Sequence, residues 1–253
     1  MSKNDKVFET PVTVAILMYG NNHTMHRRCL DSILENVSDP RTDLHLRIGL
    51  NEVCPGTIRY LTEVFRKYRI TPELLIEHDR NKLKYPVMRE LIYRQPVATK
   101  WFVWFDDDSH VTDSLWLPSL AEDINREYRN GARMFGKLYT WDLLHGQYNW
   151  YREASWWRNK PIPTAERAGK KVRRILFPTG GYWAIEYDLL LDLFWPDERL
   201  THNGGDVALG EAVRQMGYKV ASSHAHVAVN DGSRRGVSQL PAGATSKRRE
   251  VLP

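Results

Sequence analysis

Three consecutive carboxylates, Asp106, Asp107 and Asp108, follow the apolar run Trp101–Phe105. They span about 10 Å of extended chain and repel one another beside a buried strand unless a cation or several donors compensate. A divalent metal carrying a phosphate is one such cation, and a solvated acidic turn is the alternative, since Asp is common in turns. Successive side chains of an extended chain point to opposite sides, so we expect Asp106 and Asp108 to act together. Asp107 is then the member expected to tolerate substitution best.

The elements that must position this triplet alternate between strand and helix over the first hundred residues. Continuous or alternating apolar residues predict strands, and apolar residues at helical spacing predict the helices between them. Right-handed crossovers turn this order into a mostly parallel α/β sheet covered on both faces. The expected strands are 12–18, 44–50, 74–76 and 101–105, and the expected helices are 21–36, 58–68 and 87–94.

Polar residues follow three of these strands. Tyr19 and Gly20 follow the first, Asn51 follows the second, and the aspartate triplet follows the fourth. In such sheets ligands bind beyond the carboxyl ends of the strands. The sequence therefore predicts one crevice lined by all three groups.

The second half of the chain is less regular. We expect helices at 115–130 and 187–194, strands at 133–139 and 218–221, and a helix that starts at the Gly205-Asp206 pair and ends near residue 217. Residues 141–174 are expected to form a long functional loop. The predicted organisation is one compact domain, with a nucleotide-binding half at 1–110, an acceptor-binding half at 111–230 and a flexible basic tail at 231–253.

Composition bounds the class of protein. The 253 residues carry a net charge of +5, with a pI of about 9.1, which mildly favours anionic partners. Cys29 and Cys54 give neither a disulfide framework nor a zinc spacing. The first ten residues lack an apolar signal region, and no apolar run approaches the length of a membrane span. We therefore expect a cytoplasmic protein, in a host cytoplasm if the gene is viral.

Four motifs in order carry a family resemblance over about residues 11–230. They are the strand Val12–Gly20, the Asp-x-Asp pair Asp106 and Asp108, Gly180-Gly181, and Gly205-Asp206 followed by VALGEAVRQMGYKV. Together they resemble a GT-A fold, family 2-type nucleotide-sugar glycosyltransferase. The resemblance implies a metal-dependent, inverting transfer of a sugar from a donor such as a UDP-sugar.

The resemblance also implies roles for individual residues. Asp108 would hold Mn²⁺ or Mg²⁺, with Asp106 toward the ribose or the metal's waters, and His224 or His226 would add a ligand. The alternative for each histidine is an ordinary surface residue. Asp206 would be the general base, and its alternative role is a helix N-cap. The expected nucleotide-binding residues are Tyr19, Gly20, Asn51, Arg89 and Asp106.

The chain departs from the family pattern at two places. Many members have an acidic pair where this chain has Gly205-Asp206, so the first carboxylate is missing. Many also have an Asp after the second strand, where this chain has Asn51-Glu52. An Asn side chain offers a donor and an acceptor, and Asn51 is therefore expected to bind uracil.

The acceptor is expected to be a glycan or a hydroxymethylated pyrimidine in DNA. Residues 148–174 mix aromatic and basic side chains, as a surface that stacks bases and follows phosphates would. A non-catalytic nucleotide-binding protein and a nucleic-acid-binding protein on the same fold are the alternatives. The expected acceptor or lid residues are Trp156, Trp157, Gly181, Arg234 and Arg235.

Overall fold

The predicted alternation of strands and helices is confirmed in the first half of the chain. A computed structural model describes residues 7–143, 149–167, 169–202, 204–229 and 249–250. The first half contains β1 (Val12–Tyr19), α1 (His23–Glu35), α2 (Pro40–Asp43), β2 (Leu44–Asn51), α3 (Pro55–Tyr68), β3 (Leu74–His78), α4 (Lys84–Tyr93) and β4 (Trp101–Asp106). Helix α4 starts three residues before its predicted position, directly after Leu83, whose φ is +67°.

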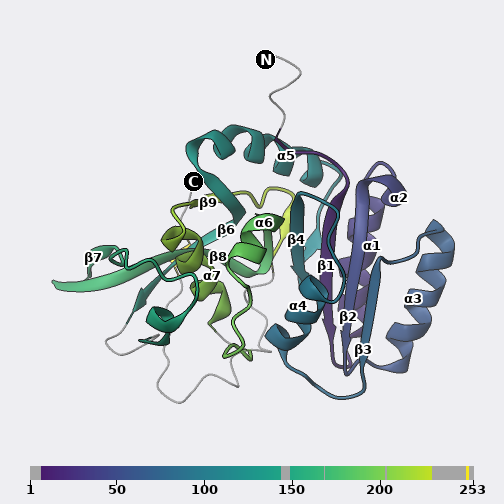
Figure 1. The fold of residues 1–253 in the computed structure, drawn as a ribbon. Helices are drawn as coiled ribbons and strands as arrows, with labels where there is room; N and C mark the ends of the chain where they lie inside the picture. Colours follow the sequence, from purple (N-terminus) through teal and green to yellow (C-terminus); the bar gives the residue numbers. More distant parts are fainter. Residues whose placement is uncertain (1–6, 144–148, 168, 203, 230–248, 251–253) are drawn as a thin grey trace.

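One mixed sheet organises the molecule, with the strand order β11-β6-β8-β4-β1-β2-β3. Strands β4, β1, β2 and β3 are parallel, whereas β8 (Lys170–Glu186) is antiparallel to both β4 and β6 (Ala132–Leu143). The carboxyl ends of β1, β2 and β4 consequently share one edge, as Figure 1 shows. The fold therefore brings together the strand ends that the sequence singles out.

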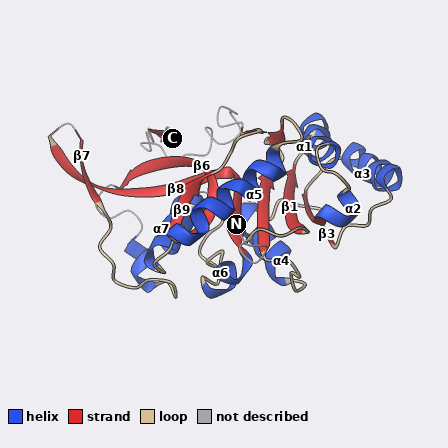
Figure 2. Ribbon diagram, turned by 90° about the horizontal axis from the view of Figure 1, so that it is seen from above, coloured by secondary structure: helices blue, strands red, loops and turns tan. Residues whose placement is uncertain are grey.

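A hydrophobic core lies on each face of the sheet. Side chains of β4 alternate between the two cores: Phe102 and Trp104 pack with α4, and Val103 and Phe105 pack with α1. All four are fully buried. This explains why the strand reads as a continuous apolar run rather than as an alternating one. Figure 2 shows helices on both sides of the sheet.

The second half differs from the prediction in the segment 141–174. It is not one continuous loop, because its two ends belong to an antiparallel ribbon of β6, β7 and β8 that extends away from the helices (Figures 1 and 2), and Asn149–Glu153 form a short 3-10 helix. The second half of the chain contains β5 (His110–Val111), α5 (Trp116–Glu127), η2 (Tyr128–Asn130), β6, η3 (Asn149–Glu153), β7 (Thr164–Arg167), β8, α6 (Tyr187–Asp192), α7 (Gly205–Gln215), β9 (Lys219–Ser222), β10 (Val227–Ala228) and β11 (Arg249–Glu250).

Within the predicted tail, β11 pairs with Tyr139 and Thr140 of β6. Among the helices that the structure describes, none has the length and apolar character needed to cross a membrane.

Candidate active site at the carboxyl edge of the sheet

Asp106 ends β4, and both of its carboxylate oxygens are bound within the protein. Its Oδ1 accepts a hydrogen bond from the indole Nε1 of Trp104 at 2.9 Å, and its Oδ2 lies 2.6 Å from the Nζ of Lys84. Trp104 is buried, and the side chains of Lys84 and Asp106 are 13% and 26% exposed. The cation that balances Asp106 here is therefore a lysine of the same chain.

Lys84 also connects Asp106 to the glycine motif of β8. Its Nζ donates to the carbonyl of Gly180 at 2.8 Å. The pairing of β6 with β8 shifts its register at this point, and such a bulge frees a carbonyl from the ladder. A Cβ added to Gly180 would lie 3.2 Å from Nζ of Lys84 and 3.6 Å from Oδ2 of Asp206. Lys84 therefore joins the Asp106 and Gly180 motifs, and Asp206 lies on the other side of Gly180.

Asp206 lies buried in the first turn of α7, where its Oδ1 accepts from the backbone N–H of Val207 at 3.1 Å. The N-cap of α7 is Gly204, with a φ of +80°, so Asp206 is not the N-cap. A helix start favours negative charge, and it holds this carboxylate beside Gly180. The position suits a group that takes a proton from a bound molecule.

The missing first carboxylate has a steric cause. A Cβ on Gly205 would lie 2.1 Å from Cζ of Tyr85, a buried ring that follows Lys84 in α4. Any side chain at position 205 would therefore displace the residue next to the lysine of the site. The close approach of α7 to α4 requires glycine here.

Asp107 points away from Asp106, but it is the buried member of the triplet. It is 4% exposed, its Oδ2 accepts from the backbone N–H of Tyr19 at 2.9 Å, and the same oxygen lies 2.9 Å from Nε2 of His26. The Nδ1 of His26 lies 2.8 Å from the hydroxyl of Thr57. Asp107 thus joins β4 to β1, α1 and α3, and these contacts argue against the expectation that it tolerates substitution best.

The four predicted metal ligands do not form one cluster. His226 pairs with Asp113 at 2.7 Å, and this hydrogen bond lowers the pKa of the Asp113 carboxyl. His224 lies 3.4 Å from the hydroxyl of Ser222. Within the described ranges, no three Asp, Glu, His or Cys side chains are grouped as a metal site would require.

Each oxygen of Asp106 accepts one hydrogen bond within the protein, from Lys84 or from Trp104. Asp108 is the remaining carboxylate of the predicted pair, and it is half-buried. Carboxylate and phosphate oxygens are ligands that Mn²⁺ and Mg²⁺ accept. These residues fit a metal with Asp108 as a protein carboxylate and a bound diphosphate as a further ligand.

Two of the predicted nucleotide-binding residues instead support the loops around the crevice. Asn51 is buried; its Nδ2 donates to Asn81 Oδ1 at 3.0 Å, and its Oδ1 accepts from the N–H of Lys82 at 2.8 Å. Its amide therefore holds the loop before α4, and the predicted contact with uracil does not fit. Gly20 has a φ of +69° and donates its N–H to the carbonyl of Asn51. Tyr19, whose carbonyl lies 3.2 Å from Nε2 of His26, forms the partly buried end of β1.

Arg89 is bound away from the aspartates. Its guanidinium donates to the carbonyl of Pro196, lies 3.4 Å from Oε1 of Glu198 and sits 4.4 Å from the ring centroid of Phe194. These contacts tie α4 to the segment after α6. Lys84 is the α4 cation that contacts Asp106, so the predicted diphosphate role does not fit Arg89.

The predicted acceptor residues fall into different settings. Trp156 is 1% exposed and packs against Tyr151, with ring centroids 5.3 Å apart, so it is unavailable for stacking. The half-buried Trp157 donates its indole N–H to Asn159. Gly181 allows a close approach, because a Cβ there would lie 2.7 Å from the hydroxyl of Ser109. Arg234 and Arg235 lie outside the described residues.

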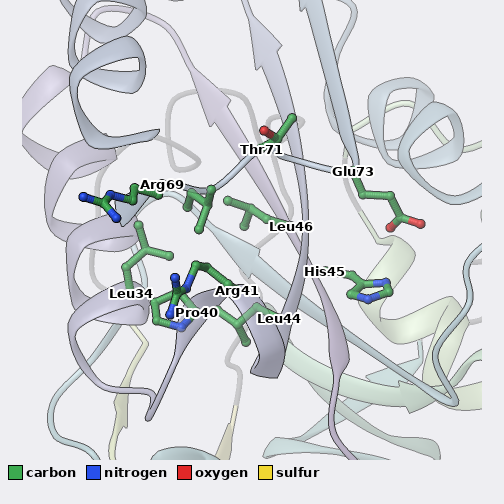
Figure 3. A pocket seen from close by; sticks show the side chains of 10 residues that line it. Leu34, Pro40, Arg41, Leu44, His45, Leu46, Arg69, Thr71 and Glu73 are labelled. Carbon is green, nitrogen blue, oxygen red and sulfur yellow. The ribbon is translucent and has the colours of Figure 1, made fainter. Parts of the chain in front are cut away.

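A hollow of about 400 Å³ lies at the opposite edge of the sheet. Leu44 and Leu46 at the start of β2 line it, together with Arg41 and Arg69 (Figure 3). None of the predicted site residues lines this hollow. It is therefore separate from the candidate site.

Sequence reasoning missed Lys84 and His202. Burial, and then the charge of Lys84, lowers the pKa of the His202 imidazole, which places this residue in the same region. The backbone N–H of Tyr85 donates to the carbonyl of Thr201, which joins the two segments. A signal for Lys84 existed, since it stands two residues before Pro86, and proline is favoured in the first turn of a helix.

No family model matches the sequence, and no curated protein sequence is similar enough to match it. The mannosyltransferase PcManGT from Pyrobaculum calidifontis, solved with GDP-Man and Mn²⁺, is 18% identical with a TM-score of 0.55, and the match covers 86% of this chain and 56% of that one. Residues 1–349 of TarS from S. aureus, in complex with UDP, are 12% identical with a TM-score of 0.54, and the match covers 85% of this chain and 58% of that one.

This chain thus spans less than two thirds of the length of either match. At these identities the likeness establishes the arrangement of the chain and nothing finer. The protein has the GT-A fold of the nucleotide-sugar glycosyltransferases, as the order of its motifs predicted.

Proposed function

We propose that this protein transfers a sugar from a nucleoside diphosphate sugar to an acceptor hydroxyl, and that the reaction inverts the anomeric centre. One observation carries the proposal: the Asp206 carboxylate lies beside Gly180, whose carbonyl binds the same lysine that pairs with Asp106. A proton acceptor and a cation thus share one crevice at the ligand-binding edge of the sheet.

The chemistry requires both groups. Bond breaking leaves negative charge on the diphosphate, and a cation lowers the cost of that charge. Attack by the acceptor hydroxyl requires a base on the opposite face of the sugar, and Asp206 takes that proton. A metal bound by Asp108 and the diphosphate would supply further positive charge to the leaving group.

A panel of UDP- and GDP-sugars tests the proposal, scored by sugar release and by transfer, in Mn²⁺, in Mg²⁺ and in EDTA. We expect turnover of one donor and propose a UDP-sugar. Nucleotide binding without turnover of any donor would instead support the non-catalytic alternative. The control is Asp192→Asn, a change at an exposed residue of α6, which leaves turnover unchanged.

The metal proposal has its own test. In the wild-type protein we expect Mn²⁺ and UDP together to raise Tm more than the sum of their separate effects. The reason is that the diphosphate supplies oxygen ligands to the metal, and the metal supplies positive charge to the diphosphate. Asp108→Asn loses this joint effect, whereas Asp192→Asn keeps it. Differential scanning fluorimetry measures all three proteins, and an undiminished joint shift in Asp108→Asn would contradict the metal role of Asp108.

The acceptor is proposed to be an anionic polymer, either a glycan or DNA that carries hydroxymethylated pyrimidines. The ribbon of β7 and β8 supports this, because Lys171 and Arg173 are exposed on it. Arg174, the next residue, pairs with Asp142 at 2.7 Å and fixes β8 to β6. Since Trp156 is buried, the proposal depends on charge and not on stacking.

Binding to duplex DNA is expected at low salt and is expected to weaken as salt rises. Lys171→Glu with Arg173→Glu lowers the slope of log K against log salt by about 2, or about 1 per lost phosphate contact. The control reverses two exposed charges of α3, Arg66→Glu with Lys67→Glu, and leaves the slope unchanged. Fluorescence anisotropy measures both. An absence of binding at low salt rules out DNA and leaves the glycan.

A further inference from the structure

We propose that Lys84 binds the diphosphate of the donor and that Asp106 is the residue that positions Lys84. The inference rests on the proposed function and assigns a ligand to a residue that the motifs leave out. It also changes the role of Asp106, from metal ligand to the anchor of a cation. Three features of the structure support it: the contacts of Lys84, those of Asp106, and the charge around the crevice.

The ammonium of Lys84 has three donors, and its hydrogen bonds within the described chain use two of them. One goes to Oδ2 of Asp106 at 2.6 Å and one to the carbonyl of Gly180 at 2.8 Å. Because position 180 is a glycine, no side chain covers Nζ from that side. The side chain is 13% exposed at the ligand-binding edge, so the third donor remains for a bound anion.

Asp106 is better placed to orient this lysine than to hold a metal. Its other oxygen accepts from Trp104, a fully buried ring that cannot move without disturbing the core. Nζ of Lys84 also lies 5.8 Å from the Trp104 ring and 6.0 Å from the Tyr85 ring. Two aromatic rings and one fixed carboxylate thus restrict the ammonium to one position. Breaking this partly buried pair would leave an unpaired charge, which is costly.

The charge of the crevice makes such a cation necessary. Asp106, Asp107, Asp108 and Asp206 place four carboxylates around this edge, and a diphosphate adds further negative charge. Like charges that share a partly buried site repel one another, because solvent screens them less there than in water. A diphosphate therefore binds here only beside a fixed cation.

Calorimetric titration with UDP and with GDP, both in EDTA, tests the assignment. We expect Lys84→Met to weaken both nucleotides by about tenfold or more, the range of a lost charge-assisted hydrogen bond. The loss is the same for UDP and GDP, because the contact is to the diphosphate and not to the base. Lys84→Arg restores part of the affinity. Lys100→Met, a lysine paired with Glu186 and 39% exposed, is the matched control with unchanged affinity.

A double-mutant cycle then separates the two roles of Asp106. If Asp106 acts through Lys84, Asp106→Asn weakens UDP in EDTA, and the double variant with Lys84→Met is no weaker than Lys84→Met alone. Additive losses overturn the positioning role. A loss in Asp106→Asn that appears only with Mn²⁺, together with a neutral Lys84→Met, makes Asp106 a metal ligand and overturns the proposal. Circular dichroism and Tm confirm that each variant folds.

The experiment also separates this inference from the proposed function. Wild-type protein that binds neither UDP nor GDP under any metal condition contradicts the proposed function itself. Wild-type binding that survives Lys84→Met contradicts only the assignment of Lys84. Nucleotide binding that depends on Lys84, without turnover of any sugar donor, supports the assignment of Lys84 and contradicts the proposed transferase activity.

Discussion

Asp206→Asn is expected to lower the rate of sugar transfer by about 10²- to 10⁴-fold, the usual contribution of a positioned general base. The amide has the same shape as the carboxylate and still offers an oxygen to the N–H of Val207, so the start of α7 is preserved. It cannot take a proton from the acceptor hydroxyl at neutral pH. Steady-state kinetics with the donor found in the panel measures the effect.

A lower transfer rate in Asp206→Asn points to a role as general base only if UDP affinity and the stability of the fold are unchanged. UDP affinity and Tm should change little, because the amide keeps the size of the carboxylate and the oxygen that accepts from the N–H of Val207. Asp192→Asn, in the exposed last turn of α6, is the matched Asp-to-Asn control and keeps full activity. A variant at position 206 that transfers sugar at the wild-type rate would remove Asp206 from the mechanism and leave nucleotide binding as the property to explain.

Asp107→Ala is expected to lower the free energy of unfolding by about 2–5 kcal/mol, because it leaves buried polar groups without their partner. The N–H of Tyr19 and the imidazole of His26 both bind its Oδ2, and His26 is fully buried. The groups that lose a partner belong to β1 and α1, so the loss affects the main body of the sheet. Urea unfolding followed by circular dichroism measures the change.

The control for this experiment is Asp192→Ala, which removes an exposed carboxylate and changes stability by less than about 0.5 kcal/mol. Asp107→Asn is a useful intermediate, since the amide still accepts from Tyr19 but loses the charge opposite His26. We expect it to fall between wild type and Asp107→Ala. Wild-type stability in Asp107→Ala would show that the buried network contributes nothing to the fold.

Much of the first half of the fold was predictable because its signals are local. The run Val12–Met18 is apolar at nearly every position, and burial on both faces of a parallel sheet produces that pattern. The ribbon at 141–174 gave no such signal. Its strands are polar on their exposed side, and β6 pairs with β8 across about thirty residues of intervening chain. The first part of β8 is exposed at Lys171 and Arg173, so no continuous apolar run marks it as a strand.

The candidate site was predictable in its positions and less so in its roles. The Gly180 segment lies beside both aspartates: its carbonyl binds the lysine that pairs with Asp106, and a Cβ at Gly180 would lie 3.6 Å from Oδ2 of Asp206. The partner of Asp106 was not predictable, because Lys84 resembles any other lysine until α4 places it. The burial of Asp107 was hidden for the same reason, since His26 precedes it by 81 residues. Partners across long sequence separations determine what a carboxylate does.

Strand β8 belongs both to the ribbon and to the crevice, since it carries the exposed Arg173 and the carbonyl of Gly180. Seven residues of extended strand separate these two positions, a span of about 23 Å. Both positions belong to one strand, and its pairing with β6 shifts register between Pro178 and Trp183, so this extended length is the upper limit of the span. An acceptor that touches the basic ribbon and also presents a hydroxyl to Asp206 must bridge this span. The fold itself would therefore select acceptors by their length, and a monosaccharide or a free nucleoside would be too short to reach both ends.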